Sequence, residues 1–216
     1  TAAHLPYQLK RGMWLGLDRG VNTFKSYKKA TLKKFSAQVL SKGVNRHLKR
    51  LKADRPWAMW VHILEPHEPY LAHKKYPFGK KLIDRYDAEI RAADEGLARI
   101  VRMLKKRGMF DNTVIIITSD HGEEFKEHGR RFHGKQLFEE SILVPLIIHV
   151  PGAPQRWVKT PVSLIDIPQT VAHLTGLAPG PDYGGVSLAS VLDGQGLPAG
   201  RPIFSDCVKG ANKNRR

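Results

Sequence analysis

A short apolar run that stops at an acidic residue and a histidine constrains the fold of this chain more than any other feature. The run spans residues 113–118, and Asp120, His121 and Gly122 follow it closely. Such a run predicts a buried strand, and a second apolar run at 144–150 predicts another. Because ligands bind at the carboxyl ends of strands in open α/β sheets, the Asp-His pair lies where a site is expected.

The other segments alternate between helical and extended patterns. Apolar residues at helical spacing predict the clearest helix at 84–107, with Gly108 as its cap. The remaining predictions are a helix at 31–52, a buried strand at 57–64, a helix at 163–174, irregular chain at 1–30 and 177–202, and the start of a strand at 203–204. This order predicts an α/β sandwich with a largely parallel central sheet. The strands at 57–64 and 113–118 would then bring their carboxyl ends to one edge, and with them one joint site.

The net charge of +16 is concentrated in one stretch, residues 24–52, which holds ten Lys and Arg and no Asp or Glu. One interpretation is attraction to a polyanion such as nucleic acid, anionic lipid or a sulfated or phosphorylated polymer. The other is a solvated helix face on a basic protein. We favour the solvated face, because no recognised nucleic-acid motif accompanies the charge.

The sequence leaves the compartment and the oligomeric state open. No apolar run approaches 18 residues, so no transmembrane segment is predicted, and residue 1 is Thr, with no secretory signal after it. The lone Cys207 excludes an internal disulfide and does not report the redox compartment. Periplasmic, extracellular and cytoplasmic locations all remain possible.

Asp120 and His121 are the candidate metal ligands. Neighbours in a strand point to opposite faces, so both can hold one metal only where the strand gives way to a turn, and Gly122 supplies that freedom. A carboxylate with an imidazole suits manganese, zinc, iron or a tolerant calcium site. Two ligands are too few for a metal ion, and an ordinary structural turn explains the same residues equally well.

Further polar residues lie in the same connection and in the Glu65–Tyr70 loop. His133 and Lys135 could hold an anionic oxygen or protonate a leaving alkoxide. The nearby acidic residues are Glu123, Glu124 and Glu127. We interpret them as parts of a solvated loop rather than as groups that support the site. His67 lies between two prolines in a stiff loop, where a structural role competes with a functional one. The residues show no Ser-His-Asp order, and Cys207 lacks an activating context.

Several blocks of this chain resemble the sulfatases of the alkaline-phosphatase superfamily, and they appear in the family's order over roughly residues 55–192. They are Trp60–Tyr70, Tyr86–Ile90 with Asp94, Asp111–Glu123, Leu137–Ile148 with Pro151–Gly152, and Pro161–Thr170 with Leu174–Gly176. The resemblance implies an alkaline-phosphatase-like α/β fold and metal-dependent hydrolysis of sulfate esters. The substrate would be a sulfated or phosphorylated small molecule or polymer.

The resemblance also implies roles for particular residues. Asp120 and His121 match the family's downstream pair of metal ligands, although many members have Asn where this chain has His121. His67 matches the histidine that contacts the sulfate group. Lys135 falls close to the substrate-binding lysine, and His133 matches a histidine that some relatives use there. The metal would be calcium by family, with manganese, magnesium or zinc as alternatives.

The chain departs from the family pattern at its chemical centre. The Cys/Ser-x-Pro-x-Arg motif, whose first residue becomes the formylglycine nucleophile, is not among these residues, and neither is the upstream Asp-Asp pair of metal ligands. We therefore expect 1–216 to be a partial sulfatase-like catalytic domain, inactive when isolated. Its parts would be a basic, partly helical entry region at 1–54, the core blocks at 55–192 and a truncated tail at 193–216. The alternatives are phosphodiester or phosphonate monoester hydrolysis, phosphoglycerol transfer, or a non-catalytic polyanion-binding fragment.

Overall fold

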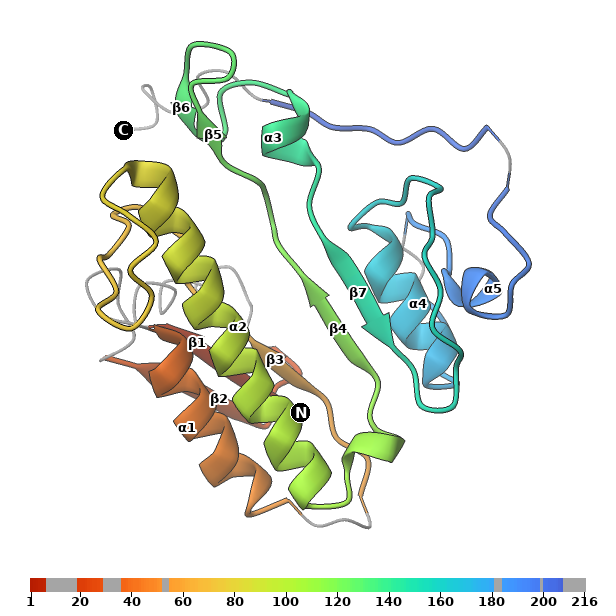
Figure 1. Ribbon diagram of the computed structural model, residues 1–216. Coiled ribbons are helices and arrows are strands. Elements are labelled where there is room, and N and C mark those ends of the chain that lie inside the picture. The colour runs from red at the N-terminus through yellow and green to blue at the C-terminus, as the bar shows by residue number, and fades with distance from the viewer. Residues whose placement is uncertain (7–18, 29–35, 52–54, 181–183, 199, 208–216) are drawn as a thin grey trace, which may run out of the picture. The chain divides into compact units, whose positions relative to one another are not determined.

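The computed structural model describes residues 1–6, 19–28, 36–51, 55–180, 184–198 and 200–207 of the chain (Figure 1). Its internal contacts divide it into two compact units, Thr1–Asn112 and Thr113–Arg216. None of the helices within the described ranges combines the length and apolar character that crossing a membrane requires. The predicted α/β class is confirmed.

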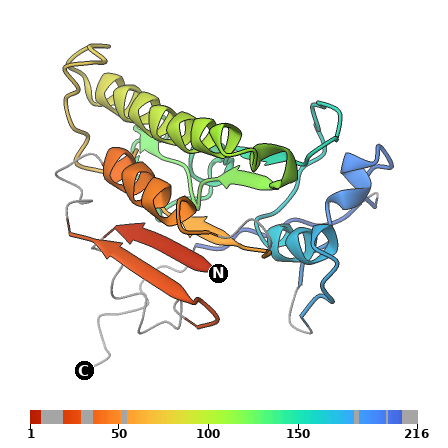
Figure 2. The ribbon, with the colours of Figure 1, turned by 90° about the horizontal axis from the view of Figure 1, so that it is seen from below.

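The first unit, where it is described, is a three-stranded parallel sheet with one helix packed on it and a second helix packed on the first. Its elements are β1 (Ala2–Pro6), β2 (Thr23–Tyr27), α1 (Ser36–Leu48), β3 (Met59–Val61), α2 (Leu82–Lys106) and the short 3-10 helix η2 (Phe110–Asn112). The strand order is β2-β1-β3, with Ala2 opposite both Thr23 and Met59. Figure 2 shows α1 lying between the sheet and α2.

The core of this unit follows the apolar stripe of α1. Leu40, Val44 and Leu48 are fully buried at helical spacing, which is how an amphipathic helix covers a sheet. A Cβ at Gly96 of α2 would lie 2.7 Å from the Ala37 Cβ of α1. The two helices therefore approach each other closely because a glycine faces an alanine.

The helix predictions for this unit are confirmed within a few residues, while its first strands were missed. The 84–107 helix is Leu82–Lys106, and the described part of the 31–52 helix is Ser36–Leu48; residues 31–35 and 52 lie outside the described residues. The prediction of irregular chain at 1–30 was wrong for β1 and β2. The 57–64 strand is shorter than expected, at Met59–Val61.

The second unit is built on an antiparallel pair, β4 (Ile115–Thr118) with β7 (Leu146–His149). The parallel pairing expected of the sheet thus holds in the first unit and not for this pair. A two-stranded hairpin and three helices complete the unit: β5 (Glu124–Phe125), β6 (Arg131–Phe132), α3 (Glu139–Ile142), α4 (Asp166–Leu174) and α5 (Ala189–Leu192). The short helix α5 corrects the prediction that 177–202 is all loop, and residues 203–204 form no strand.

Asp166 ties the later part of this unit together. Its fully buried carboxylate accepts two hydrogen bonds from the Arg201 guanidinium, at 2.7 and 2.8 Å, and further ones from the N–H groups of Ser163 and Val186. Bidentate, charge-assisted bonds of this kind are strong and directional. One side chain therefore joins α4 to the segments before α5 and near residue 201.

Candidate active site

The segment after β4 places the candidate metal ligands in a tight turn. The Ser119 hydroxyl donates to the His121 carbonyl oxygen at 2.7 Å, and the His121 N–H donates to Asp120 Oδ1 at 3.1 Å. The Gly122 N–H donates to the Ser141 carbonyl oxygen at 2.9 Å, and a Cβ on Gly122 would overlap the Glu140 carbonyl oxygen. Glycine is required at this position because α3 leaves no space for a side chain, rather than for its backbone freedom.

The donor atoms of Asp120 and His121 are arranged as a two-ligand half-site. His121 Nδ1 lies 2.9 Å from the Gly122 carbonyl oxygen, which can only accept, so in the neutral ring the proton is on Nδ1 and the lone pair on Nε2. Metal-binding histidines are oriented in this way. Nε2 lies 3.7 Å from Asp120 Oδ1, close enough that the two atoms could bind one ion together. These residues fit a metal ion as part of its shell.

The half-site is open to solvent and incomplete within the described residues. The Asp120 side chain is 71% exposed and the His121 side chain 38%. No group of three or more His, Cys, Asp and Glu side chains converges as a metal site in the described ranges. Further ligands are therefore needed to bind a metal ion.

His133 is held next to His121 by a buried acid. Its Nδ1 lies 3.0 Å from Glu123 Oε1, and the Glu123 side chain is only 4% exposed. The His133 and His121 rings stack with their centroids 3.8 Å apart. The interpretation of Glu123 and Glu124 as a solvated loop was wrong, since both are buried and Glu124 Oε1 accepts a hydrogen bond from the Ser141 hydroxyl.

The backbone around His133 is unusual. Phe132 has φ 72° and Gly134 has φ 72°, so His133 stands between two residues in the left-handed region. For a bulky residue such as Phe132 that conformation costs roughly 1–3 kcal/mol, and such residues cluster at functional sites.

The exposed Lys135 follows, with its Nζ 5.9 Å from the Phe132 ring centroid. The Cys207 thiol lies 3.5 Å from the Gly134 carbonyl oxygen.

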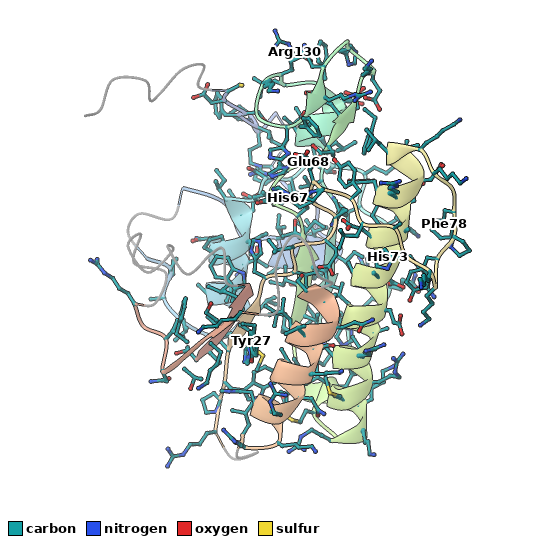
Figure 3. All side chains as sticks on the ribbon, turned by 90° about the vertical axis from the view of Figure 1, so that its left-hand side faces the viewer. Tyr27, His67, Glu68, His73, Phe78 and Arg130 are labelled. Atoms are coloured by element: carbon teal, nitrogen blue, oxygen red, sulfur yellow. The ribbon has the colours of Figure 1, made fainter. Side chains whose placement is uncertain are left out.

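His67 belongs to the first unit, in the loop between β3 and α2, where Figure 3 marks it beside Glu68. Its Nδ1 lies 2.6 Å from the Glu68 carbonyl oxygen. Two X-Pro bonds of this loop, Glu65–Pro66 and Glu68–Pro69, are cis. The expected joint site of His67 with the residues after β4 stays a prediction, as do the roles of all five site residues.

Two histidines outside this cluster, His128 and His4, make contacts typical of structural residues. His128 stacks on the Phe138 ring with the centroids 3.5 Å apart, and its Nδ1 is 3.3 Å from Glu140 Oε1. His4 is fully buried, and its Nδ1 is 2.8 Å from the Tyr27 hydroxyl. Burial, together with nearby basic groups, lowers the pKa of His4 to about 4, so it is a neutral core residue.

The basic stretch of the first unit is a solvated face where it is described. Lys25, Lys42, Arg46 and Lys49 are exposed, and within the described residues none of these four forms an ion pair. Attraction of this face to a polyanion stays a prediction.

Comparison with known proteins identifies the family. The family model "Sulfatase" matches residues 7–177 of the chain. The choline-sulfatase of Rhizobium meliloti (strain 1021) is 28% identical over 185 residues, which are 65% of this chain and 36% of that protein. Arylsulfatase K of Mus musculus is 37% identical over 108 residues, 50% of this chain and 19% of that protein. This chain belongs to the sulfatase family.

A solved structure shares the fold of this chain. The phosphonate monoester hydrolase of Agrobacterium radiobacter matches with a TM-score of 0.69 and 26% identity, covering 83% of this chain and 47% of that one. The chain spans less than half the length of each of these three relatives. Sulfatases generally use a divalent metal ion.

Proposed function

We propose that the protein containing this chain hydrolyses sulfate esters with the help of one divalent metal ion, and that residues 1–216 are part of its catalytic domain. The observation that carries the proposal is the cluster after β4. There a carboxylate–imidazole donor pair, Asp120 and His121, lies against His133, which a buried acid orients. Membership of the sulfatase family supports the same reaction.

Each residue has a role in this proposal. Asp120 Oδ1 and His121 Nε2 hold the metal, which when bound neutralises charge on the transferring sulfate group. Calcium is the metal we propose by family, with manganese, magnesium or zinc as alternatives, and of these zinc best suits an imidazole donor. Other ligands complete its shell.

His133 and Lys135 act on the ester itself. When the S–O bond breaks, the departing alkoxide needs a proton, and we assign its donation to His133, whose Nδ1 lies 3.0 Å from Glu123 Oε1. The ammonium of Lys135 attracts the anionic ester, and His67 contacts the sulfate group.

Phosphonate monoester hydrolysis is the second candidate, because the Agrobacterium radiobacter enzyme shares the fold with a TM-score of 0.69. The experiment that separates the two is a panel of an aryl sulfate, a phosphodiester and a phosphonate monoester, given to the full-length protein. We expect the highest kcat/KM on the sulfate. Turnover of the phosphorus substrates alone would reject the sulfatase proposal.

A further inference from the structure

A buried acid that the proposed function does not use, Glu89, faces the loop that carries His67. Glu89 lies in the first half of α2 and is only 2% exposed. Among the described residues no cation forms an ion pair with it. A leucine would fill similar space without the cost of desolvating a carboxyl group, so the particular contribution of Glu89 is its hydrogen bonds.

The hydrogen bond that Glu89 accepts comes from the backbone of the loop. The Leu71 N–H donates to Glu89 Oε1 at 2.7 Å, and the His67 backbone N–H has a smaller, lowering effect on the pKa of Glu89. The acid therefore holds the segment 67–71 at its Leu71 end. Glu89 Oε2 is buried with no hydrogen-bond partner in the described part of the chain.

The other side of the loop is fixed by a second acid. The Glu65 carboxylate accepts hydrogen bonds from the Ser36 hydroxyl and, at 3.1 Å, from the Ala37 N–H at the start of α1. Such an anion is favoured at a helix N-terminus, where the N–H groups have no partner within the helix. The loop is thus tied to α1 through Glu65 and to α2 through Glu89, on either side of His67.

Protonation does not break the Glu89 anchor. Burial raises the pKa of Glu89 to about 7, the backbone N–H of Leu71 opposes that shift, and the Glu65 carboxylate adds to it. A neutral carboxyl group still accepts a hydrogen bond through one oxygen, and the unpartnered Oε2 is free to carry the proton. The loop stays attached in either state.

We propose that Glu89 is a positioning residue for His67: its carboxyl group holds the backbone of the 67–71 segment and so sets where the His67 ring stands. The inference rests on the proposed function for its catalytic consequence. Without the acceptor, the part-buried Leu71 N–H loses its partner, and the segment moves to find another. A displacement of about 1 Å at a catalytic group can lower the rate by about 100-fold.

The test compares three variants of the full-length protein. Glu89→Leu removes the acceptor, Glu89→Gln keeps an amide oxygen at the same place, and Leu104→Ala makes a cavity at another buried residue of α2. The first readout is the His67 imidazole resonance, assigned by its loss in His67→Asn. The second is the pair kcat and KM on the sulfate ester.

We expect Glu89→Leu to shift the His67 resonance and to lower kcat at least 10-fold with KM within about 2-fold. Glu89→Gln should restore both, and Leu104→Ala should change neither. If the protein does not turn over sulfate esters, the resonance still decides. An unchanged His67 signal in Glu89→Leu, or an equal shift in Leu104→Ala, overturns the proposal. Should Glu89→Leu not fold, Glu89→Asp withdraws the acceptor by one methylene and is expected to give the same shift.

Discussion

Two buried carboxyl groups, one in each unit, have pKa values that are shifted in opposite directions. Burial pushes the pKa of Asp166 up, but the Arg201 guanidinium and the N–H groups of Val186 and Ser163 outweigh it and hold the pKa below its ordinary value. Burial also dominates at Glu89, where two backbone N–H groups are too few to compensate, and the pKa rises to about 7. The burial of the Asp166 carboxylate is thus offset by an ion pair and backbone hydrogen bonds. The burial of Glu89, beside the loop that carries His67, is only partly offset.

The two acids are therefore expected to contribute to the molecule in different ways. Breaking a saturated buried pair leaves a charge with no compensation, so Asp166 with its cation is expected to support the fold of the second unit. An acid that is costly to ionise contributes little net stability at neutral pH. The main contribution of Glu89 is therefore expected to be the position of the loop.

The largest effect on stability is expected from removing Arg201, the cation that is paired with Asp166. Arg201→Met leaves a fully buried carboxylate without its ionic partner, and the free energy of unfolding should fall by about 3–5 kcal/mol. Chemical denaturation at pH 7 measures it, with the exposed Arg130→Met as the matched control. A loss below about 1 kcal/mol would show that the pair is not the anchor described here.

A smaller effect, with a characteristic pH dependence, is expected at Glu89. Its folded pKa is raised from 4.5 to about 7, so the folded state holds the proton more tightly and stability is lost as pH rises through this range. The shift corresponds to about 3 kcal/mol, an upper value. Glu89→Gln should remove that loss and be more stable than wild type at pH 8.

The comparison also predicts the opposite slope for the other acid. Because the pKa of Asp166 is lowered, its contribution is present at neutral pH and is lost as pH falls through the folded pKa. Denaturation curves between pH 3 and pH 8 for wild type, Glu89→Gln and Asp166→Asn measure both slopes. Parallel pH profiles for wild type and Glu89→Gln would contradict the account of Glu89.

The smallest expected effect concerns a third buried acid, Glu123, which is paired with His133. Glu123→Ala removes the group that orients the imidazole. Groups that support catalytic or metal-binding histidines in this way typically change activity by about 10–100-fold, and we expect the low end, in kcat rather than KM. The exposed Glu127→Ala is the control, and equal kcat values in the two variants would argue against an orienting role.

The sequence predicted the elements whose residues carry a strong period. The helix α2 and the strands β4 and β7 were found within two residues at each end, because their apolar spacing reflects the faces they bury. β1 was missed, since its buried residues include the small Ala2 and Ala3 and the polar His4, which form no apolar pattern.

The candidate site was predictable in its residue types and not in its supporting contacts. Asp120, His121 and His133 stood out by motif and resemblance. Glu123 lies ten residues before His133, and Arg201 lies 35 residues after Asp166. Such pairs depend on how distant segments fold together, and an acidic residue looks the same in sequence whether it is solvated or buried.

The most direct test of the central proposal, that Asp120 and His121 hold the metal of a sulfate ester hydrolase, is metal-dependent turnover by the full-length protein. We expect chelation to abolish hydrolysis of an aryl sulfate and added divalent metal to restore it in the wild type. Asp120→Ala should need a metal concentration at least about 10-fold higher, as calorimetric titration of the metal would also show. Full turnover in chelator, or an Asp120→Ala variant that binds metal and turns over like wild type, would contradict the account.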